Sequence, residues 1–451
     1  MNRDPRGVIA NSPMSPMQVA VVAITVCLNA LDGFDVLSIS FASNGIAKEW
    51  GIVPGALGIV LSMELIGMAI GSASIGGVAD KIGRRPTILG CLVVMATGMV
   101  MATTVHTVVG LSIWRVVTGL GIGGMLAAIN AAVAEFSNAR RRHLSVSLMS
   151  IGYPLGAVFG GMVATRLLRS GDWRLVFYFG AAATTVLIPI VFLAVPESIH
   201  WLARKQPAGA LDKINRGLAR LGHQRVEALP ELTAEARGKS ISDIFAPGLI
   251  AGTVIVTLAY FFHITTFYFI AKWTPRIVNN FGFPASSAAG VLVWVNVGGA
   301  TGGAIFGLLT QRYSVKSLTI GILLASTVAV AAFGRSPADL QTLSMIGGVA
   351  GFCTNAGIVG LYAIIAQVFP THVRAFGSGF AIGVGRGGAV IAPMIAGFMF
   401  QYQYSLPVIA MTLAAGSLFG ALVLLMLKME GDQPAAVQTA PRRTSPAPAS
   451  A

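Results

Sequence analysis

Five charged residues stand inside long apolar stretches of this 451-residue sequence: Asp32, Asp35, Glu64, Arg115 and Arg386. A charged side chain near the middle of a lipid bilayer costs about 2.5 kcal/mol or more, so a residue of this kind is expected to bind an ion or a ligand. Acids can carry protons, and an Arg can hold a carboxylate. The set therefore indicates proton transfer and anion binding within a membrane.

Asp32 and Asp35 are three residues apart and would share one face of a helix. Asp32 would lie roughly 21 Å into its apolar stretch, at or just past the membrane midplane. Two such carboxylates resist ionising together at low dielectric constant, and they titrate as one coupled unit. We expect at least one of them to carry protons. The alternative is that one only caps a helix or pairs with a buried Arg.

Arg386 lies near the middle of its apolar stretch, among glycines that let a neighbouring helix or a ligand come close. Its planar guanidinium matches a carboxylate with two parallel hydrogen bonds. Two interpretations stay open: Arg386 binds the carboxylate of a substrate, or it forms a permanent salt bridge with Asp32 or Asp35. The two states can alternate, because a proton on the Asp would release the Arg.

The other titratable residues in apolar stretches also allow two interpretations each. Arg115 opens a glycine-rich stretch and is expected either to have a functional role, as charges inside a membrane commonly do, or to pair with an acid or a backbone carbonyl. Glu64 precedes Gly67 and Gly71, whose spacing lets two helices touch. It is either a second proton site or a protonated acid hydrogen-bonded between helices. His263 either contacts substrate or is an ordinary core residue.

The composition dictates which elements carry these residues. The chain is 55% hydrophobic and 11% charged with a mean hydropathy of +0.75, whereas a soluble domain carries about 25% charge. Apolar stretches long enough to span a bilayer number twelve and cover residues 18–42, 54–78, 86–105, 109–134, 144–168, 174–195, 248–272, 286–310, 317–334, 340–367, 375–400 and 405–428. The sequence predicts an all-α polytopic membrane protein. We expect no enzyme, cofactor or metal, because metal-ligand spacings, nucleophile motifs and phosphate-binding loops are absent from the sequence.

The Lys and Arg residues are distributed unevenly between the two sides of the membrane. Of 31, 22 fall on the side of the N-terminus and seven, Lys272 among them, on the other side, while Arg115 and Arg386 lie within the spans. Because cytoplasmic segments carry the excess of positive charge, both termini are expected in the cytoplasm and the protein in a bacterial inner membrane. The lipid bilayer thus explains the net charge of +14 without nucleic acid.

The spans form two groups of six. We expect a cytoplasmic N-terminal segment at 1–17, a six-helix bundle at 18–195, a cytoplasmic linker at 196–243 with an amphipathic helix around 209–221, a second bundle at 244–429 and a disordered cytoplasmic tail at 430–451. Two bundles built from repeats are typical of secondary transporters. The loop at 307–316 is a weak copy of the loop at 76–85.

Four motifs carry a resemblance to a known family. The loop 76–85 (GGVADKIGRR) and the stretch 115–124 (RVVTGLGIGG) resemble two signatures of the major facilitator superfamily. Residues 32–35 (DGFD) and 383–389 (GVGRGGA) together resemble the aromatic acid:proton symporter family. The resemblance implies import of a small aromatic carboxylate, such as a hydroxybenzoate or protocatechuate, with protons by alternating access. It also implies that Arg115 serves proton coupling and Arg386 binds the carboxylate.

A pocket for an aromatic acid needs flat apolar walls as well as a cation. Of the aromatic residues within spans, Phe34, Tyr153 and Phe380 are expected level with Asp32 and Arg386.

The remaining charged positions of interest form a predicted cytoplasmic gate that consists of Asp80, Arg84, Arg85 and Glu135. We expect a monomer. Alternative functions are a porter for another small organic acid or a sugar, and a transporter-like receptor that binds ligand without moving it.

Overall fold

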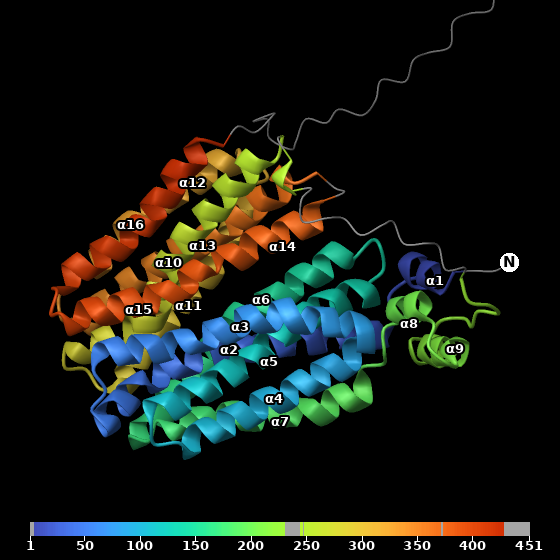
Figure 1. Cartoon of the computed structure of the whole chain (residues 1–451), viewed down its shortest axis with the longest axis horizontal. Helices are drawn as coiled ribbons and strands as arrows, with labels where there is room; N and C mark the ends of the chain where they lie inside the picture. Colours follow the sequence, from blue (N-terminus) through green and yellow to red (C-terminus); the bar gives the residue numbers. More distant parts are fainter. Residues whose placement is uncertain (1–3, 231–243, 247, 371–372, 428–451) are drawn as a thin grey trace, which may run out of the picture.

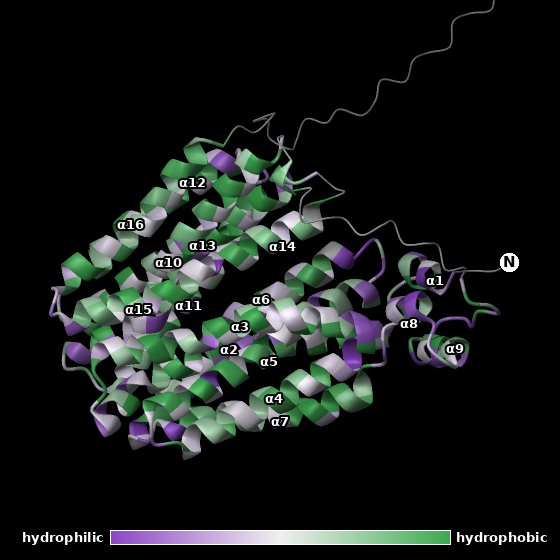
Figure 2. Ribbon diagram, viewed as in Figure 1, coloured by the Kyte–Doolittle hydropathy of each residue, from purple (hydrophilic) through white to green (hydrophobic). Residues whose placement is uncertain are grey.

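The computed structural model describes residues 4–230, 244–246, 248–370 and 373–427. In this part of the chain, twelve helical segments are long and apolar enough to cross a membrane, as the sequence predicts. They run side by side as two bundles, with apolar residues along their lengths and polar residues gathered at the ends (Figures 1 and 2). The predicted all-α fold with two six-helix bundles is confirmed.

The first bundle contains the helices α2 (Pro16–Trp50), α3 (Pro54–Ile82), α4 (Arg84–Thr104), α5 (Val108–Phe136), α6 (Arg142–Leu167) and α7 (Arg174–Ala194). The second contains α10 (Ile250–Asn280), α11 (Ala285–Leu309), α12 (Val315–Phe333), α13 (Leu340–Val368), α14 (Arg374–Gly385), α15 (Gly387–Gln401) and α16 (Leu406–Leu425). Here α14 and α15 are the two halves of one span. The turn η1 (Leu168–Ser170) follows α6.

Three short helices lie together at one end of the molecule: α1 (Pro5–Asn11), α8 (Ile199–Lys205) and α9 (Ala210–Arg220) (Figure 1). The helix α9 is the amphipathic helix that the sequence predicts in the linker, and its buried residues include Ile214 and Leu218. We name this the linker end and the opposite end the far end. The rest of the predicted linker at 231–243 and the predicted disordered tail at 430–451 lie outside the described residues.

Local sequence fixes where the helices begin. Ser15 and Gln18 form a reciprocal capping box at the start of α2, in which each side chain accepts from the other residue's backbone N–H. Pro16 and Pro54 stand at the first position of α2 and α3, where a missing N–H costs nothing. Asp339 caps α13 by accepting from the backbone N–H of Thr342 at 2.7 Å.

Small residues set how closely the helices pack within each bundle. Gly67 and Gly71 on α3 lie against backbone carbonyls of α5, where a Cβ atom has no room. Gly298 and Gly302 on α11 lie in the same way against carbonyls of α13. Such close approach of two backbones is the usual use of glycine between membrane helices. The α3–α5 and α11–α13 pairs are therefore equivalent units of the two bundles.

The two bundles contact each other mainly in the half away from the linker end. There α3 packs on α15 and α6 packs on α11. Ser62 donates to the Val390 carbonyl at 2.7 Å, and Asn44 donates to the Pro275 carbonyl at 2.9 Å. At the linker end, α14 packs on α10, α13 and α15 of its own bundle and stands apart from α6 (Figure 1). The conformation is closed at the far end.

Candidate functional site

A buried charge cluster joins the three helices α3, α5 and α10 in the half of the molecule nearer the far end. Glu64 on α3 pairs with Arg115 on α5, and its other oxygen lies 3.4 Å from the Nζ atom of Lys272 on α10. All three side chains are 0% exposed. A buried charge is tolerated only when it is paired and hydrogen-bonded, so the three residues depend on one another.

Both cations of this cluster also bind the backbone of α2. Arg115 donates to the Asp35 carbonyl at 3.1 Å, and Lys272 donates to the Val36 carbonyl. The Arg115 guanidinium further lies 5.4 Å from the centroid of the Phe177 ring. Thus α2 is held from one side by its own bundle and from the other by the second bundle.

Asp32 and Asp35 differ from these residues because their carboxylates have no hydrogen-bond partner among the described residues. Both are buried, with 2% and 0% of their surface exposed. The charged groups that act on Asp32 are the acids Asp35 and Glu64, whereas Asp35 also lies within reach of Arg115. Three acids therefore face two bases, and a single proton makes this group electrically neutral.

Lys272 was not predicted to belong to this site. The sequence places it at the non-cytoplasmic end of a span that stops at 272, and this placement is wrong: α10 continues to Asn280, and Lys272 is fully buried inside it. The sequence does contain a pattern that could have placed Lys272 beside the tyrosines. Tyr260, Tyr268 and Lys272 follow one another at multiples of four residues, so they share one face of α10.

Arg386 lies at a break in the eleventh span, where the sequence predicts one continuous helix over 375–400. The helix α14 ends at Gly385, and Arg386 separates it from α15. The Arg386 carbonyl accepts from the amides of Ala389 and Val390 at 2.9 and 3.3 Å. Gly385 and Gly388 lie directly against α10, with no room for a Cβ atom beside the Tyr260 ring or the Phe261 carbonyl. These contacts place the break beside the tyrosine-bearing face of α10.

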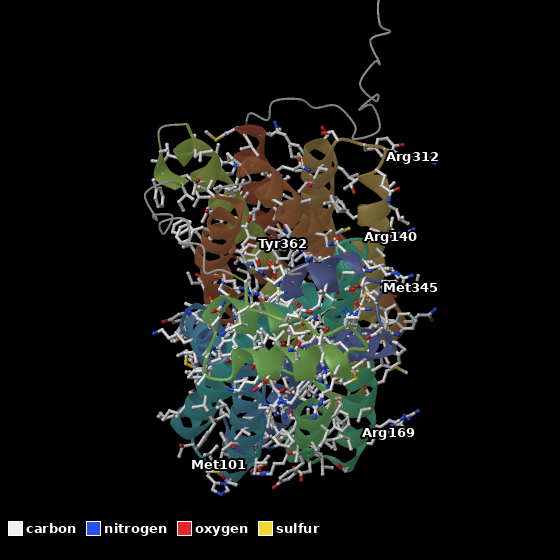
Figure 3. The ribbon with its side chains drawn as sticks, turned by 90° about the vertical axis from the view of Figure 1, so that its right-hand side faces the viewer. Met101, Arg140, Arg169, Arg312, Met345 and Tyr362 are labelled. Atoms are coloured by element: carbon white, nitrogen blue, oxygen red, sulfur yellow. The ribbon has the colours of Figure 1, made fainter. Side chains whose placement is uncertain are left out.

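A group of tyrosines surrounds the Arg386 side chain. Tyr260 and Tyr268 of α10 and Tyr362 of α13 lie within its electrostatic reach, with the Tyr260 hydroxyl beside the guanidinium. The hydroxyls of Tyr260 and Tyr362 are 3.2 Å apart. Tyr362 lies near the boundary of the two bundles when the molecule is viewed from the linker end (Figure 3). Arg386 therefore stands among hydroxyl groups and flat rings.

Tyr153 of α6 completes this group from the first bundle. It lies within electrostatic reach of Tyr268, Arg386 and Asp32, so it links the tyrosines to the acids. No ion pair within the described part of the chain joins Arg386 to a carboxylate. The permanent salt bridge from Arg386 to Asp32 or Asp35 is therefore not present in this conformation.

Three predicted substrate contacts do not join this group. Phe34 packs within the first bundle, 5.2 Å from the Phe179 ring centroid. Phe380 packs toward the linker end against Phe245, at 5.3 Å, because it precedes Arg386 by about one and a half helical turns. His263 is 0% exposed, with both ring nitrogens hydrogen-bonded at 2.8 Å, to Ser417 and to the Thr354 carbonyl. The structure favours the core interpretation of His263.

The predicted gate residues lie at the linker end, within the first bundle. Arg84 bridges Asp80 at 2.8 Å and Glu135 at 2.9 Å, and Arg204 of α8 also reaches Asp80 at 2.9 Å. Arg85 instead donates to the Phe192 carbonyl at 2.5 Å and lies over the Phe192 ring. Three of the four predicted residues are therefore brought together.

Glu197 and Ser198 are hydrogen-bonded to these linker-end residues, and sequence reasoning did not assign them to the predicted gate. The Glu197 carboxylate accepts from the backbone amides of Arg84 and Ser198, both at 2.8 Å. Ser198 donates to Glu135 at 2.5 Å. Burial raises the pKa of the Glu197 carboxyl above its ordinary value, against the lowering effect of the amide hydrogen bonds. The Pro-Glu-Ser sequence after the sixth span was the available signal.

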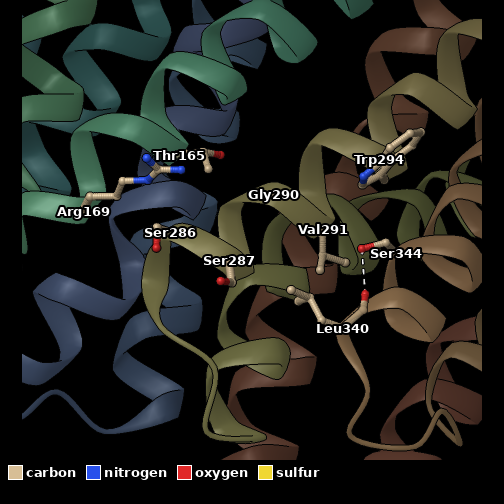
Figure 4. Close-up of a pocket in the computed structure, with 9 residues that line it drawn as sticks. All are labelled: Thr165, Arg169, Ser286, Ser287, Gly290, Val291, Trp294, Leu340 and Ser344. Atoms are coloured by element: carbon tan, nitrogen blue, oxygen red, sulfur yellow. Dashed lines mark hydrogen bonds between the residues drawn. The ribbon is translucent and has the colours of Figure 1, made fainter.

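Two cavities lie between the bundles. One lies beside the tyrosine group and is lined by Tyr153 and Pro154 together with residues of α10, α11 and α13 that include Asn296 and Asn355. The other is at the far end, between α6 with η1 and the start of α11 (Figure 4). Arg169 is its only charged lining residue among those described, and its other lining side chains are apolar or hydroxylic. The inner cavity shares Tyr153 with the group of residues around Arg386.

The sequence as a whole matches a known family. A profile described as Major Facilitator Superfamily covers residues 22–299 and 256–451. The chain belongs to the Major Facilitator Superfamily. Members of this superfamily are transporters, so this chain is a transporter and not an enzyme. Together with its twelve apolar helices, membership makes it an integral membrane protein.

Curated superfamily relatives cover nearly the whole chain. The 4-hydroxybenzoate transporter PcaK of Pseudomonas putida is 28% identical over 394 residues, 86% of this chain and 87% of its own length. The gallate transporter of Pseudomonas putida is 25% identical, covering 92% of this chain and 93% of its own length. The 3-(3-hydroxy-phenyl)propionate transporter of Escherichia coli is 26% identical over 92% of this chain and 96% of its own length. The resemblance to the aromatic acid:proton symporter family is thus confirmed.

Solved superfamily structures share the fold. A D-xylose-proton symporter superimposes with a TM-score of 0.71 at 18% identity, covering 90% of this chain and 97% of its own. The xylose transporter XylE from E. coli in an inward open conformation gives a TM-score of 0.70, also at 18% identity, over 91% of this chain and 96% of its own. At this level of identity the likeness establishes the arrangement of helices alone.

Proposed function

We propose that this protein is a proton-coupled symporter that imports a small aromatic carboxylate by alternating access. The observation that carries the proposal is the position of Arg386. It stands at a helix break and pairs with no carboxylate in the described part of the chain, with tyrosines of both bundles around it and a buried acid cluster nearby. A cation, flat rings and hydroxyl groups are the recognition elements that a hydroxylated aromatic acid requires.

In this proposal Arg386 binds the substrate carboxylate with its guanidinium fork. Tyr260, Tyr268 and Tyr362 supply ring faces and hydroxyl donors from the second bundle, and Tyr153 supplies them from the first. A ligand held by both bundles favours their closure around it, because the contacts form fully only when the bundles approach. The substrates named for the relatives, 4-hydroxybenzoate, gallate and 3-(3-hydroxyphenyl)propionate, are all aromatic acids.

The proton would be carried by the aspartate pair, and chiefly by Asp32. The charged groups within reach of Asp32 are the acids Asp35 and Glu64, whereas Asp35 also lies within reach of the cation Arg115. Glu64 and Arg115 neutralise each other and hold α3 and α5 together beside the pair. Proton coupling thus uses Asp32 as carrier and Asp35, Glu64 and Arg115 as the charges that tune it.

The placement in the cell belongs to the same proposal. The linker end carries Arg84, Arg140, Arg204 and Arg312, and the excess of positive residues assigns it to the cytoplasm. Both termini would then be cytoplasmic, the membrane would be a bacterial inner membrane, and the far end would face outward. The unit would be a monomer with bundles at 18–195 and 244–429. The conformation described above would be closed to the outside.

Uptake into proteoliposomes tests the proposal. Labelled 4-hydroxybenzoate, benzoate, gallate and a sugar would be offered with an inward proton gradient, with and without an uncoupler. We expect an aromatic acid to accumulate and the uncoupler to abolish accumulation. Asp32→Asn should remove accumulation, Arg386→Ala should remove binding, and Arg312→Ala, at an exposed site, should change neither. Accumulation of the sugar alone would overturn the substrate assignment, and binding without any uptake would indicate a receptor.

A further inference from the structure

Among the residues that the structure describes, Lys272 is the only charged one that the second bundle contributes to the buried charge cluster. The charged groups that act on it, Glu64 and Arg115, both belong to the first bundle. Its Nζ atom also donates to the Val36 carbonyl of α2. Every recorded interaction of its ammonium group therefore crosses the boundary between the bundles.

This boundary is the one that must open for substrate to enter from the far end. Lys272 lies three residues before Pro275, whose carbonyl accepts from Asn44 across the boundary. Ser62, two residues from Glu64, donates across the same boundary to Val390. Moving the second bundle away at the far end carries α10 with it, and the Lys272 ammonium must then leave Glu64 and Val36.

The charge balance of the cluster changes with that movement. In the closed conformation, the acids Asp32, Asp35 and Glu64 face Arg115 and Lys272. With Lys272 withdrawn, the same three acids face Arg115 alone, and the fully ionised group carries one further negative charge. Excess negative charge in a medium of low dielectric constant is relieved by binding a proton. Tyr153 and Tyr268 also adjoin the cluster.

We infer that Lys272 is a positioning residue that makes proton affinity depend on bundle closure: its ammonium displaces a proton from the acid cluster when the far end closes and admits one when it opens. This inference deepens the proposed symport and rests on it. Because linkage is reciprocal, a proton on the cluster must in turn favour the conformation that is open at the far end. Lys272 thus acts through Glu64 and the aspartates and touches no substrate.

A cysteine placed at the closed boundary measures this linkage directly. Ser62→Cys, in a chain whose exposed Cys27 is Ser, puts a nearly isosteric thiol at a position that is 0% exposed in this conformation. Labelling of reconstituted full-length protein by a membrane-impermeant maleimide from the far side is compared at about pH 5.5 and about pH 7.5. The intrinsic reaction rate is corrected with an exposed cysteine at the far end.

We expect the corrected labelling rate to rise about fivefold or more at the lower pH, in line with ordinary coupling free energies. In Lys272→Met, labelling should be fast at both pH values. Lys272→Arg, which keeps the charge, should regain part of the pH dependence. Thr274→Val, a matched control on a buried α10 residue, should behave like the parent. Equal pH dependence in the parent and in Lys272→Met would overturn the inference.

Transport assays distinguish this inference from the proposed symport on which it rests. Lys272→Met should exchange labelled for unlabelled aromatic acid yet fail to accumulate it with a proton gradient, while the parent does both. A parent that accumulates nothing would refute the symport itself. A Lys272→Met protein that accumulates substrate as the parent does would refute only the role of Lys272. Loss of fold in Lys272→Met would leave Lys272→Arg to decide: because it keeps the charge, a folded Lys272→Arg protein should retain part of the parent's pH dependence, and labelling independent of pH in that variant would overturn the inference.

Discussion

Glu64 and Arg115 form an ion pair in which neither side chain is exposed at all, and Arg115 also binds the backbone of Asp35 on a third helix. Removing Arg115 would leave Asp32, Asp35 and Glu64 facing Lys272 alone, and loss of one partner of a buried pair costs about 3–5 kcal/mol. Arg115→Gln should therefore lower the melting temperature of the purified protein clearly. Arg115→Lys should lower it less, because it keeps the charge. Equal stability of parent and Arg115→Gln in a thermal melt would contradict the pairing.

Arg386→Lys tests whether the planar fork, rather than positive charge alone, recognises the substrate. A charge-assisted hydrogen bond contributes about 1.5–3 kcal/mol, so loss of one bond of a bidentate pair should weaken binding about tenfold or more. Isothermal titration with an aromatic acid measures the loss. The methyl ester of the same acid serves as the control ligand and should bind parent and variant alike. A variant that binds the free acid as tightly as the parent would refute the bidentate contact.

The paired hydroxyls of Tyr260 and Tyr362 allow a smaller substitution at the same site than Arg386→Lys. Tyr260→Phe keeps the ring and removes the hydroxyl that lies 3.2 Å from that of Tyr362. One neutral hydrogen bond contributes about 1 kcal/mol, so KM for a hydroxylated acid should rise roughly fivefold. The matched control is Tyr402→Phe, at an exposed position. If KM for hydroxybenzoate is unaffected by Tyr260→Phe, this hydroxyl does not contact the substrate.

Gly397 allows a steric test of closure at the far end. It lies between the Pro54 carbonyl and the Cα atom of Gly58 in the other bundle, and a Cβ atom there meets the Pro54 carbonyl at 2.6 Å. Gly397→Leu should therefore hold the bundles apart and make a cysteine at position 62 accessible to impermeant maleimide. Gly307→Leu, where a Cβ atom meets nothing within 4 Å, is the control. Unchanged labelling in Gly397→Leu would show that the boundary opens elsewhere.

Glu197 at the linker end predicts a pH dependence of stability. Its folded-state pKa is raised by burial, so the folded protein keeps this proton to higher pH than the unfolded chain does. The contribution of Glu197 to stability is then fully present below its ordinary pKa of 4.5 and is lost as pH rises through the folded pKa. Glu197→Gln, which stays neutral and still accepts hydrogen bonds, should gain stability relative to the parent as pH rises. Melting curves of both proteins from about pH 4 to about pH 8 measure this difference. A constant difference would contradict it.

The sequence predicted the fold well because each membrane helix is visible as a local run of apolar residues. Each span is a continuous apolar stretch, and the glycines at 67 and 71 mark a helix contact that the structure contains. The intramembrane charges were also found individually, since each stands out against apolar neighbours. Hydropathy does not show where a helix ends. The helix α10 extends past 272 to Asn280, so Lys272, which is at the end of the predicted span, is in fact fully buried.

Side-chain direction was the harder part of the site. Depth along a helix favoured Phe34 and Phe380, but depth does not say which face a residue occupies. Phe34 turns into its own bundle and Phe380 toward the linker, whereas Tyr153 lies at the boundary between bundles. The face is set by packing partners distant in sequence, such as the Gly385 contact with Tyr260. Single-sequence patterns do not contain that information.

The interruption of the eleventh span at Arg386 has a mechanical consequence. Arg386 keeps α-helical φ and ψ angles and its N–H donates to the Ile382 carbonyl at 2.9 Å, so the two segments remain joined as one span whose halves have different packing partners. The segment toward the linker end, α14, packs on α10 and α13, while α15 packs on α3 of the other bundle. A ligand bound to the Arg386 guanidinium would contact the point where α14 and α15 meet. Its binding and release would therefore act directly on the orientation of α14.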